Sequence, residues 1–252
     1  MANGKATHLP LRLIALGLAW LLSAPAWAQE IKVTLLGTGA PIPLMDRQGP
    51  ATLVEAGGKL LLFDAGRGVS QRLWQLKKPL SAIDALFITH LHSDHLVGLP
   101  DLWLTGWLQP EYGRRQAPLR IVGPQKTSAL TQSLKTGFAP DIAYRTEKEG
   151  LSAAGIEFNV SEIAQAGAVY EEGGLRVTAF EVDHGVVKPA YGYRIDFSGR
   201  SVVISGDTTF TPELVKQARG VDLLVHEIVA AAPALRENPF VKRQFEYHSS
   251  PS

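Results

Sequence analysis

One six-residue stretch, His90-Leu91-His92-Ser93-Asp94-His95, places three imidazoles and one carboxylate within a single short segment. It follows an apolar run over residues 85–88, which predicts a buried strand of a layered α/β sheet. The residues after it predict a helix, and a turn from strand to helix is where α/β folds place ligands. Four ligand-type side chains exceed what one tetrahedral ion with an open water position needs. The spacing therefore predicts two neighbouring metal ions that share one loop.

Three later segments place further polar side chains after predicted strands. They are Asp183-His184-Gly185, Gly206-Asp207-Thr208 and His226-Glu227. Polar groups at consecutive strand ends converge on one edge of a sheet, so we predict that His184 and Asp207 join the cluster. The chain contains no cysteine, so any metal site must be built from His, Asp and Glu.

The N-terminus predicts a secretory signal peptide. Lys5 and Arg12 are followed by an apolar run over residues 13–24 and by the small-residue segment Ala26-Trp27-Ala28. The apolar run is shorter than the ~20 residues of a comfortable membrane span, although an uncleaved anchor is the alternative. We expect cleavage after Ala28, a signal peptide over residues 1–28, one large α/β domain over residues 29–252, and a periplasmic or secreted protein without a membrane span.

The charge balance offers no footprint for nucleic acid. The formal net charge is +1, and removal of Lys5 and Arg12 with the signal leaves 23 basic and 24 acidic residues, a net charge of −1. The sequence shows no long basic stretch, and Arg114-Arg115 is only a doublet. Since nucleic-acid binding depends on clustered Lys and Arg, the sequence predicts no nucleic-acid partner, and it leaves a homodimer open.

Apolar runs bounded by turn residues predict the remaining elements. The predicted strands cover residues 31–36, 52–56, 59–63, 83–89, 119–122, 156–160, 175–182, 191–197, 201–205 and 221–225. The predicted helices cover residues 69–76, 125–137 and 211–219. Residues 139–174 show no clear pattern apart from residues 156–160. Trp103, Trp107 and Tyr112 suit either a substrate pocket or packing of the helix after the metal loop, and packing is favoured.

Together these residues resemble the metallo-β-lactamase superfamily, in the branch that includes tRNase Z and bacterial arylsulfatase-like hydrolases. The resemblance covers nearly all of residues 31–252. It is carried by Gly37-Thr38-Gly39, Phe63-Asp64-Ala65-Gly66, the loop of residues 90–95, His184, Gly206-Asp207-Thr208, His226-Glu227 and His248-Ser249-Ser250. It implies an α/β fold, the αββα metallo-β-lactamase sandwich, with metal ions at one edge of the two sheets.

The resemblance also implies roles for individual residues. One zinc ion would be held by His90, His92 and His184, the other by Asp94 and His95, with Asp207 bridging both. Asp94 would orient or take a proton from a bridging hydroxide, and His248, paired with Glu227, would protonate the leaving group. Asp64 is either an acceptor for a ligand N–H or a turn-capping residue. His226 is not a usual ligand in this branch.

The chain departs from the family pattern in three respects. The family normally supplies another histidine to the second ion, downstream of the segment that begins at His248, whereas this sequence stops at Ser252. The sequence therefore predicts a truncated C-terminal end and a weakened second zinc site. The interval from His184 to Asp207 is too short for the long tRNA-gripping arm of many relatives. The predicted signal peptide would also remove the protein from tRNA.

These observations lead to a preferred function with alternatives. The preferred hypothesis is an exported dinuclear metal-dependent hydrolase, phosphodiesterase-like or arylsulfatase-like, that attacks a phosphodiester, aryl sulfate or similar small ester through a metal-bound hydroxide. The first alternative is a tRNA 3′-end processing endonuclease, tRNase Z. The second is an inactive, truncated metal-binding remnant. A true β-lactamase is disfavoured by the bridging Asp207.

Overall fold

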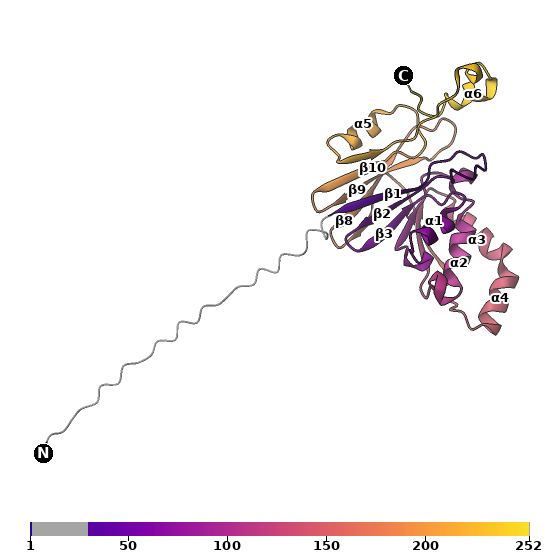
Figure 1. Cartoon of the computed structure of the whole chain (residues 1–252), viewed down its shortest axis with the longest axis vertical. Helices are drawn as coiled ribbons and strands as arrows, with labels where there is room; N and C mark the ends of the chain where they lie inside the picture. The colour runs from indigo at the N-terminus through magenta and orange to yellow at the C-terminus, as the bar shows by residue number, and fades with distance from the viewer. Residues whose placement is uncertain (2–29, 252) are drawn as a thin grey trace.

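The computed structural model describes Met1 and residues 30–251 as two β-sheets packed face to face, with helices on both outer faces (Figure 1). This arrangement confirms the predicted αββα sandwich. The predicted signal peptide over residues 1–28 lies, apart from Met1, outside the described residues. No helix within the described part of the chain is long and apolar enough to cross a membrane.

The first sheet has six strands in the order β1-β2-β3-β4-β5-β6. Their bounds are β1 Ile31–Gly37, β2 Ala51–Ala56, β3 Lys59–Phe63, β4 Ala85–Phe87, β5 Leu119–Gly123 and β6 Phe158–Glu162. β1, β2 and β3 pair antiparallel, and β2 turns into β3 across Gly57 and Gly58, whose φ angles are 57° and 75°. From β3 to β6 all pairs are parallel, so β3 and β4 end at the same edge of the sheet.

The second sheet has five strands in the order β11-β10-β9-β8-β7. Their bounds are β7 Gly167–Glu172, β8 Leu175–Glu181, β9 Tyr191–Phe197, β10 Arg200–Ile204 and β11 Leu223–Val225. β7 to β10 pair antiparallel, whereas β11 runs parallel to β10. β10 and β11 therefore also end at a common edge.

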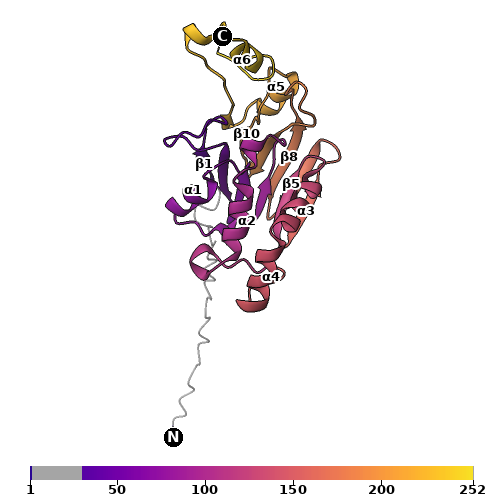
Figure 2. The ribbon, with the colours of Figure 1, turned by 90° about the vertical axis from the view of Figure 1, so that its right-hand side faces the viewer.

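Helices cover the outer face of each sheet. The α-helices are α1 Val69–Gln75, α2 Leu99–Trp107, α3 Thr127–Gly137, α4 Ala139–Lys148, α5 Pro212–Ala218 and α6 Pro239–Gln244, and the 3-10 helices are η2 Leu80–Ala82, η3 Ser93–His95, η4 Pro110–Tyr112 and η5 Pro233–Leu235. Figure 2 shows α1, α2 and α3 in front of the first sheet. α5 lies against the second sheet, where Leu214 packs with Phe180 and Val203.

Aromatic and aliphatic side chains fill the space between the sheets. Phe63 stacks on Phe87 with ring centroids 4.8 Å apart, and Tyr193 of the opposite sheet meets Phe87 at 5.5 Å. Under the helices, Trp103 and Trp107 are fully buried, which confirms that they pack the helix after the metal loop. Tyr112, by contrast, is 38% exposed.

The two sheets are also tied together by hydrogen bonds at the edge where β4 ends. The Tyr193 hydroxyl donates to the Ile88 carbonyl at 2.6 Å, and the Tyr191 N–H donates to the Thr89 carbonyl at 2.9 Å. These bonds fix the start of the histidine loop against β9. The edge that carries the polar strand ends is therefore held in register across both sheets.

Candidate metal centre

Five strand ends deliver the polar side chains to one edge of the sandwich. β3 is followed by Asp64 and β4 by the loop of residues 90–95, while β8 leads to His184, β10 to Asp207 and β11 to Glu227. Because both sheets end at this edge, residues far apart in the sequence meet there. This convergence is the one that the strand-end pattern predicts.

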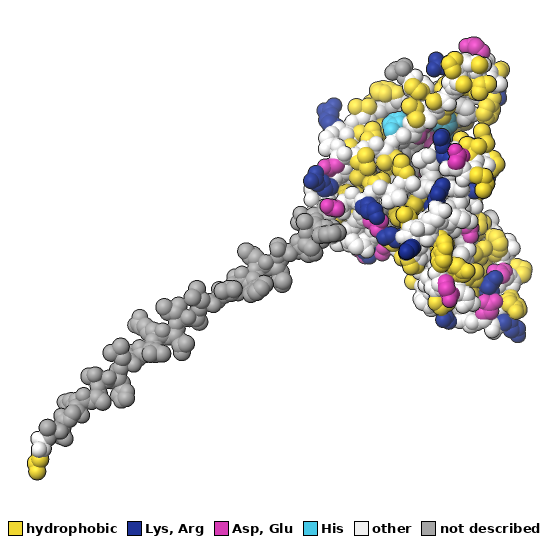
Figure 3. Space-filling model, in the orientation of Figure 1, with side chains coloured by type: hydrophobic (Ala, Val, Ile, Leu, Met, Phe, Trp, Pro, Cys, Tyr) yellow, Lys and Arg dark blue, Asp and Glu magenta, His cyan; other side chains and the backbone are white. Residues whose placement is uncertain are grey.

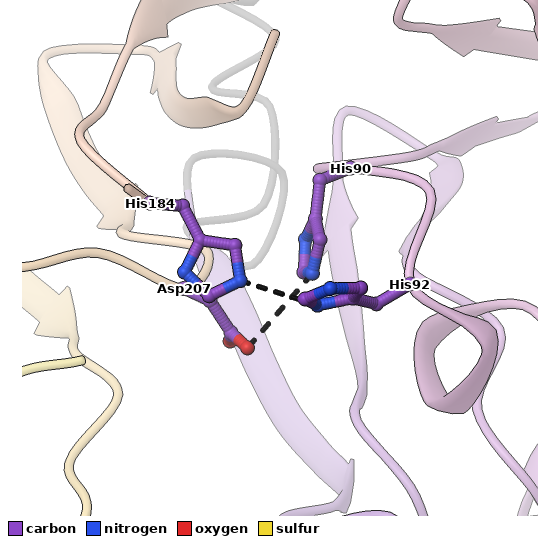
Figure 4. A group of neighbouring side chains, drawn as sticks. All are labelled: His90, His92, His184 and Asp207. Carbon is purple, nitrogen blue, oxygen red and sulfur yellow. Dashed lines mark hydrogen bonds and ion pairs between the residues drawn. The ribbon is translucent and has the colours of Figure 1, made fainter. Parts of the chain in front are cut away.

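A first cluster consists of His90, His92, His184 and Asp207. Their ligand atoms all lie within 4.8 Å of one another, and the four side chains point toward a common centre (Figure 4). His92 Nδ1 and His184 Nε2 are 3.2 Å apart, and His90 Nε2 is 3.9 Å from Asp207 Oδ2. Three imidazole nitrogens and one carboxylate oxygen form a donor set that suits zinc.

A second cluster shares Asp207 with the first. His95 Nε2 lies 3.3 Å from Asp207 Oδ2 and 3.8 Å from Asp94 Oδ2. The structure thus brings together all six residues predicted as metal ligands, in two groups that meet at one carboxylate. Such an arrangement could hold two ions side by side.

The residues present fit a metal ion, and His90 gives the clearest sign. Its side chain is buried, and its Nε2 atom has no hydrogen-bond partner in the described structure. Burial, together with the neighbouring His95, lowers the pKa of His90 to about 2, so the ring is a neutral donor. A buried, unpartnered nitrogen is costly unless something binds it, and a cation at this point would satisfy it.

The pKa shifts of Asp207 and His95 also indicate a site for a cation. Burial alone would raise the pKa of Asp207, but the hydrogen bond from His95 and the surrounding imidazoles hold it well below its usual range. Burial alone would lower the pKa of His95, yet Asp64 and Asp207 raise it well above its usual value. The carboxylates of Asp64 and Asp207 therefore strongly favour a positive charge between them.

Asp64 and Thr89 hold two of the histidines in position. The Asp64 carboxylate accepts hydrogen bonds of 2.8 Å from His95 Nδ1, the Thr89 N–H and the Thr89 hydroxyl. The same hydroxyl lies 3.0 Å from His90 Nδ1, which donates to it. With each Nδ1 occupied as a donor, each Nε2 is the ring nitrogen that faces the cluster and would bind a cation there. Asp64 is thus an acceptor for a ligand N–H, and it holds this place at a left-handed φ of 59°.

The carbonyl of Tyr247 orients His184. His184 Nδ1 donates to this oxygen at 2.8 Å, which leaves Nε2 free to face His92. Burial lowers the pKa of His184, so this ring is also neutral and can offer a lone pair to a cation. Tyr247 could not be predicted from the sequence, because a backbone carbonyl can come from any residue type.

Glu227 fixes His248 beside the cluster. Its Oε1 atom accepts hydrogen bonds from the backbone N–H groups of Thr208 and Ser249 at 3.1 and 2.9 Å, and it lies 3.2 Å from His248 Nδ1. His248 Nδ1 is also 3.7 Å from Asp207 Oδ2. Burial would lower the pKa of His248, but Glu227 and Asp207 raise it, so the ring favours the protonated form.

Gly206 permits the segment after β10 to approach both the neighbouring strand β9 and Thr89, which follows β4 of the first sheet. A Cβ atom at this position would lie 2.6 Å from the Tyr191 carbonyl oxygen, and φ is 61°.

His226 follows the neighbouring strand β11, is exposed and lies outside both clusters, with its Nδ1 against the Glu227 carbonyl. The sequence-based exclusion of His226 from the ligands agrees with this geometry.

The fold and the side chains at its edge define a metal-dependent hydrolase of the metallo-β-lactamase fold. A family model described as Anti-Pycsar protein Apyc1 matches residues 31–235. Ribonuclease Z of Mycobacterium marinum (strain ATCC BAA-535 / M) is 38% identical over 225 residues, which cover 87% of this chain and 78% of that protein. Ribonuclease Z of Mycolicibacterium gilvum (strain PYR-GCK) is also 38% identical, over 87% of this chain and 77% of that protein.

Solved structures agree with these relatives. Human tRNase Z, short form, superposes with a TM-score of 0.61 at 25% identity, over 86% of this chain and 92% of that one. The metallo-β-lactamase fold protein YhfI from Bacillus subtilis gives 0.59 at 22% identity, over 79% and 70% of the two chains. The chain belongs to the ribonuclease Z-like branch of the metallo-β-lactamase superfamily.

These relatives overturn the preferred functional hypothesis from the sequence. The prediction of a hydrolase of small esters, with no nucleic-acid partner, is wrong, because the relatives at 38% identity are named Ribonuclease Z. They support the alternative, tRNA processing. The error came from the charge pattern: the sequence has no long basic run, but a charge count along the chain does not show how charges are placed on the folded surface.

Proposed function

We propose that this chain is a ribonuclease Z-type endonuclease that cuts a phosphodiester bond at the 3′ end of precursor tRNA. The observation that carries the proposal is the pair of clusters sharing Asp207, in a chain 38% identical to proteins named Ribonuclease Z. Phosphodiester cleavage needs charge stabilisation at both the attacking and the leaving oxygen, and two adjacent cation sites suit that need.

Zinc is the ion that we propose for both clusters, since imidazole nitrogen and carboxylate oxygen are its usual donors without cysteine. Bound there, two such ions would supply Lewis acidity to water and to the phosphate. We propose His90, His92, His184 and Asp207 for one ion, and Asp94, His95 and Asp207 for the other.

The remaining steps of the proposed reaction are proton transfers. Asp94 lies at the edge of the second cluster, so its carboxylate is placed to orient the attacking water and take its proton. His248 favours the protonated form and is oriented by Glu227. Its imidazolium can donate a proton to the leaving alkoxide, which is a poor leaving group without one.

The test is cleavage of a labelled precursor tRNA carrying a 3′ trailer by the zinc-loaded protein. We expect a single cut near the 3′ end of the mature tRNA, and loss of that cut in His92→Ala and Asp207→Ala. The variants should remain folded by circular dichroism. Absence of cleavage by the wild type, or undiminished cleavage by both variants, would refute the proposal.

A further inference from the structure

A groove on the outside of the molecule runs between β1, α1 and the loop of residues 38–50. Its volume is about 390 Å³. The loop contributes Arg47 and Gln48, α1 contributes Arg72 and Gln75, and β1 contributes Leu35 to its floor. We call it the arginine groove, and none of its residues belongs to the two metal clusters.

The arginine groove is connected by a chain of backbone hydrogen bonds to the edge of the sandwich that carries the two metal clusters, here called the catalytic edge. The Gly49 N–H donates to the Arg67 carbonyl at 3.0 Å, and the Gly66 N–H donates to the Pro50 carbonyl at 2.9 Å. The neighbouring Ala65 N–H donates to the His95 carbonyl at 2.8 Å. The wall of the groove is therefore continuous with the loop that carries the metal-ligand histidines.

Three guanidinium groups lie along this path and have no carboxylate partner among residues 30–251. Arg67 is exposed at the junction with the catalytic edge, where its Nη1 donates to the Pro41 carbonyl at 3.3 Å. Arg47 is exposed, and Arg72 Nη1 donates only to the Gln75 amide oxygen, at 2.9 Å. Asp46 also lines the groove, so the three arginines leave a net charge of +2 along the path.

The surface view agrees with this distribution. Figure 3 shows several Lys and Arg side chains between the histidine atoms at the catalytic edge and the lower part of the face that carries β1 and α1. The basic and acidic residues of the chain nearly balance, 25 against 24, yet Arg47, Arg67 and Arg72 have no carboxylate partner among residues 30–251. Such an arrangement complements a phosphate backbone.

We propose that the arginine groove binds the single-stranded part of the RNA substrate as it leaves the cleavage site. This inference rests on the proposed function. Arg67, Arg47 and Arg72 would contact successive phosphates, and the amides of Gln48 and Gln75 would face sugar or base edges. A volume of about 390 Å³ is near the small end of ligand sites, which suits a strand crossing the groove and not a duplex lying in it. Exposed Leu35 and Leu76 offer an apolar surface to a base.

The test compares wild type with the double variant Arg47→Gln/Arg72→Gln. Binding of a fluorescein-labelled 12-nucleotide oligouridylate is measured by anisotropy in EDTA, where no cleavage occurs, over a series of salt concentrations. We expect affinity to fall about 10-fold or more at low salt, and the slope of log K against log salt to shrink by about 1.4, or ~0.7 for each lost phosphate contact. Arg176→Gln/Arg200→Gln, which removes two exposed arginines of the second sheet, should bind like wild type.

Cleavage assays distinguish a failure of the groove proposal from a failure of the proposed function. With zinc, the double variant should show a raised KM for precursor tRNA with a long trailer, and unchanged hydrolysis of bis(4-nitrophenyl) phosphate. Oligouridylate binding that depends on Arg47 and Arg72 without any RNA cleavage would sustain the groove and refute the function. RNA cleavage with unchanged affinity, KM and salt slope in the double variant would overturn the groove alone. Polyglutamate bound by wild type as tightly as the RNA would also overturn it.

Discussion

At the scale of single residues, the centre depends on side chains that set which nitrogen of each imidazole faces the cluster. Asp64, Thr89 and the Tyr247 carbonyl occupy one nitrogen each of His95, His90 and His184. The sequence predicted which side chains meet at this edge, because histidine and aspartate at close spacing are rare without a shared purpose. It could not predict Thr89 or Tyr247, since a hydroxyl and a backbone carbonyl carry no distinctive pattern.

Asp64→Asn should weaken metal binding. An amide cannot accept all three hydrogen bonds that converge on this carboxylate, so His95 and Thr89 would lose their fixed orientation. We expect zinc affinity, measured by competition with a chromogenic chelator, to fall by about 10–100-fold. Asp101→Asn, on the exposed side of α2, is the matched control and should bind zinc like wild type. Equal affinities in all three proteins would show that Asp64 does not support the site.

His248→Ala should slow the cleavage of substrates with poor leaving groups more than that of substrates with good ones. Cleavage of RNA expels an alkoxide that needs a proton, so its rate should drop by about 10²–10⁴-fold. Hydrolysis of bis(4-nitrophenyl) phosphate should change little, because nitrophenolate leaves without one. His226→Ala serves as the control and should leave both rates intact. Equal slowing of the two substrates in His248→Ala would argue against a role as general acid.

At the scale of elements, the strands were predictable from short apolar runs bounded by glycine and polar turns. β1, the β2–β3 hairpin, β5 and β8–β10 fall where the pattern placed them. α4 and β7 were not predicted. β7 alternates weakly, and only Tyr170 within it is buried. α4 buries no residue fully, and Ile142 is its one large aliphatic side chain, packed against the core. The strand predicted over residues 83–89 is shortened to β4. Ile88 still donates its N–H to the Val122 carbonyl of β5, and the chain then leaves the sheet to present the histidines.

The end of the sandwich away from the metal centre is closed by an ion-pair network between the sheets. Lys59 of β3 contacts Glu172 of β7 and lies 3.2 Å from Asp84 Oδ1, while the Tyr170 hydroxyl donates to Glu172 Oε2 at 3.0 Å. The hydrogen bond from Lys59, then that from Tyr170, lowers the pKa of Glu172 from 4.5. Because the folded-state pKa is lowered, its stabilising effect is present above pH 4.5 and is lost as the pH falls through the folded-state value.

Glu172→Gln should therefore lower the melting temperature at neutral pH and have a vanishing effect in acid. The measurement is the melting temperature of wild type and variant from pH 7 down to pH 3. Glu171→Gln is the matched control, since Glu171 pairs with Arg176 within one sheet. A difference between wild type and Glu172→Gln that stayed constant over this pH range would contradict an electrostatic link between the sheets.

At the scale of the whole molecule, the fold and the metal edge were predictable and the substrate was not. The proposed metal ligands are local in sequence or follow strands, whereas Arg47 and Arg72 line one groove only because loop 38–50 folds against α1. A charge count along the chain therefore missed the nucleic-acid surface that we propose. A homodimer stays a prediction.

The signal peptide also stays a prediction, with a direct measurement. If residues 1–28 direct export and are removed, the protein purified from the source cells should begin at Gln29 by intact-mass and N-terminal analysis. An intact Met1 or Ala2 terminus would show that export does not occur by this route. Either terminus leaves the assay with purified protein and precursor tRNA unaffected.

The central claim is that Asp207 joins two cation sites at the edge where both sheets end. Metal content per chain, measured by equilibrium dialysis against zinc followed by elemental mass spectrometry, tests it most directly. We predict two zinc ions in wild type and in His226→Ala, and at most one in Asp207→Ala. An unchanged zinc count in folded Asp207→Ala, or no bound zinc in wild type, would contradict the account.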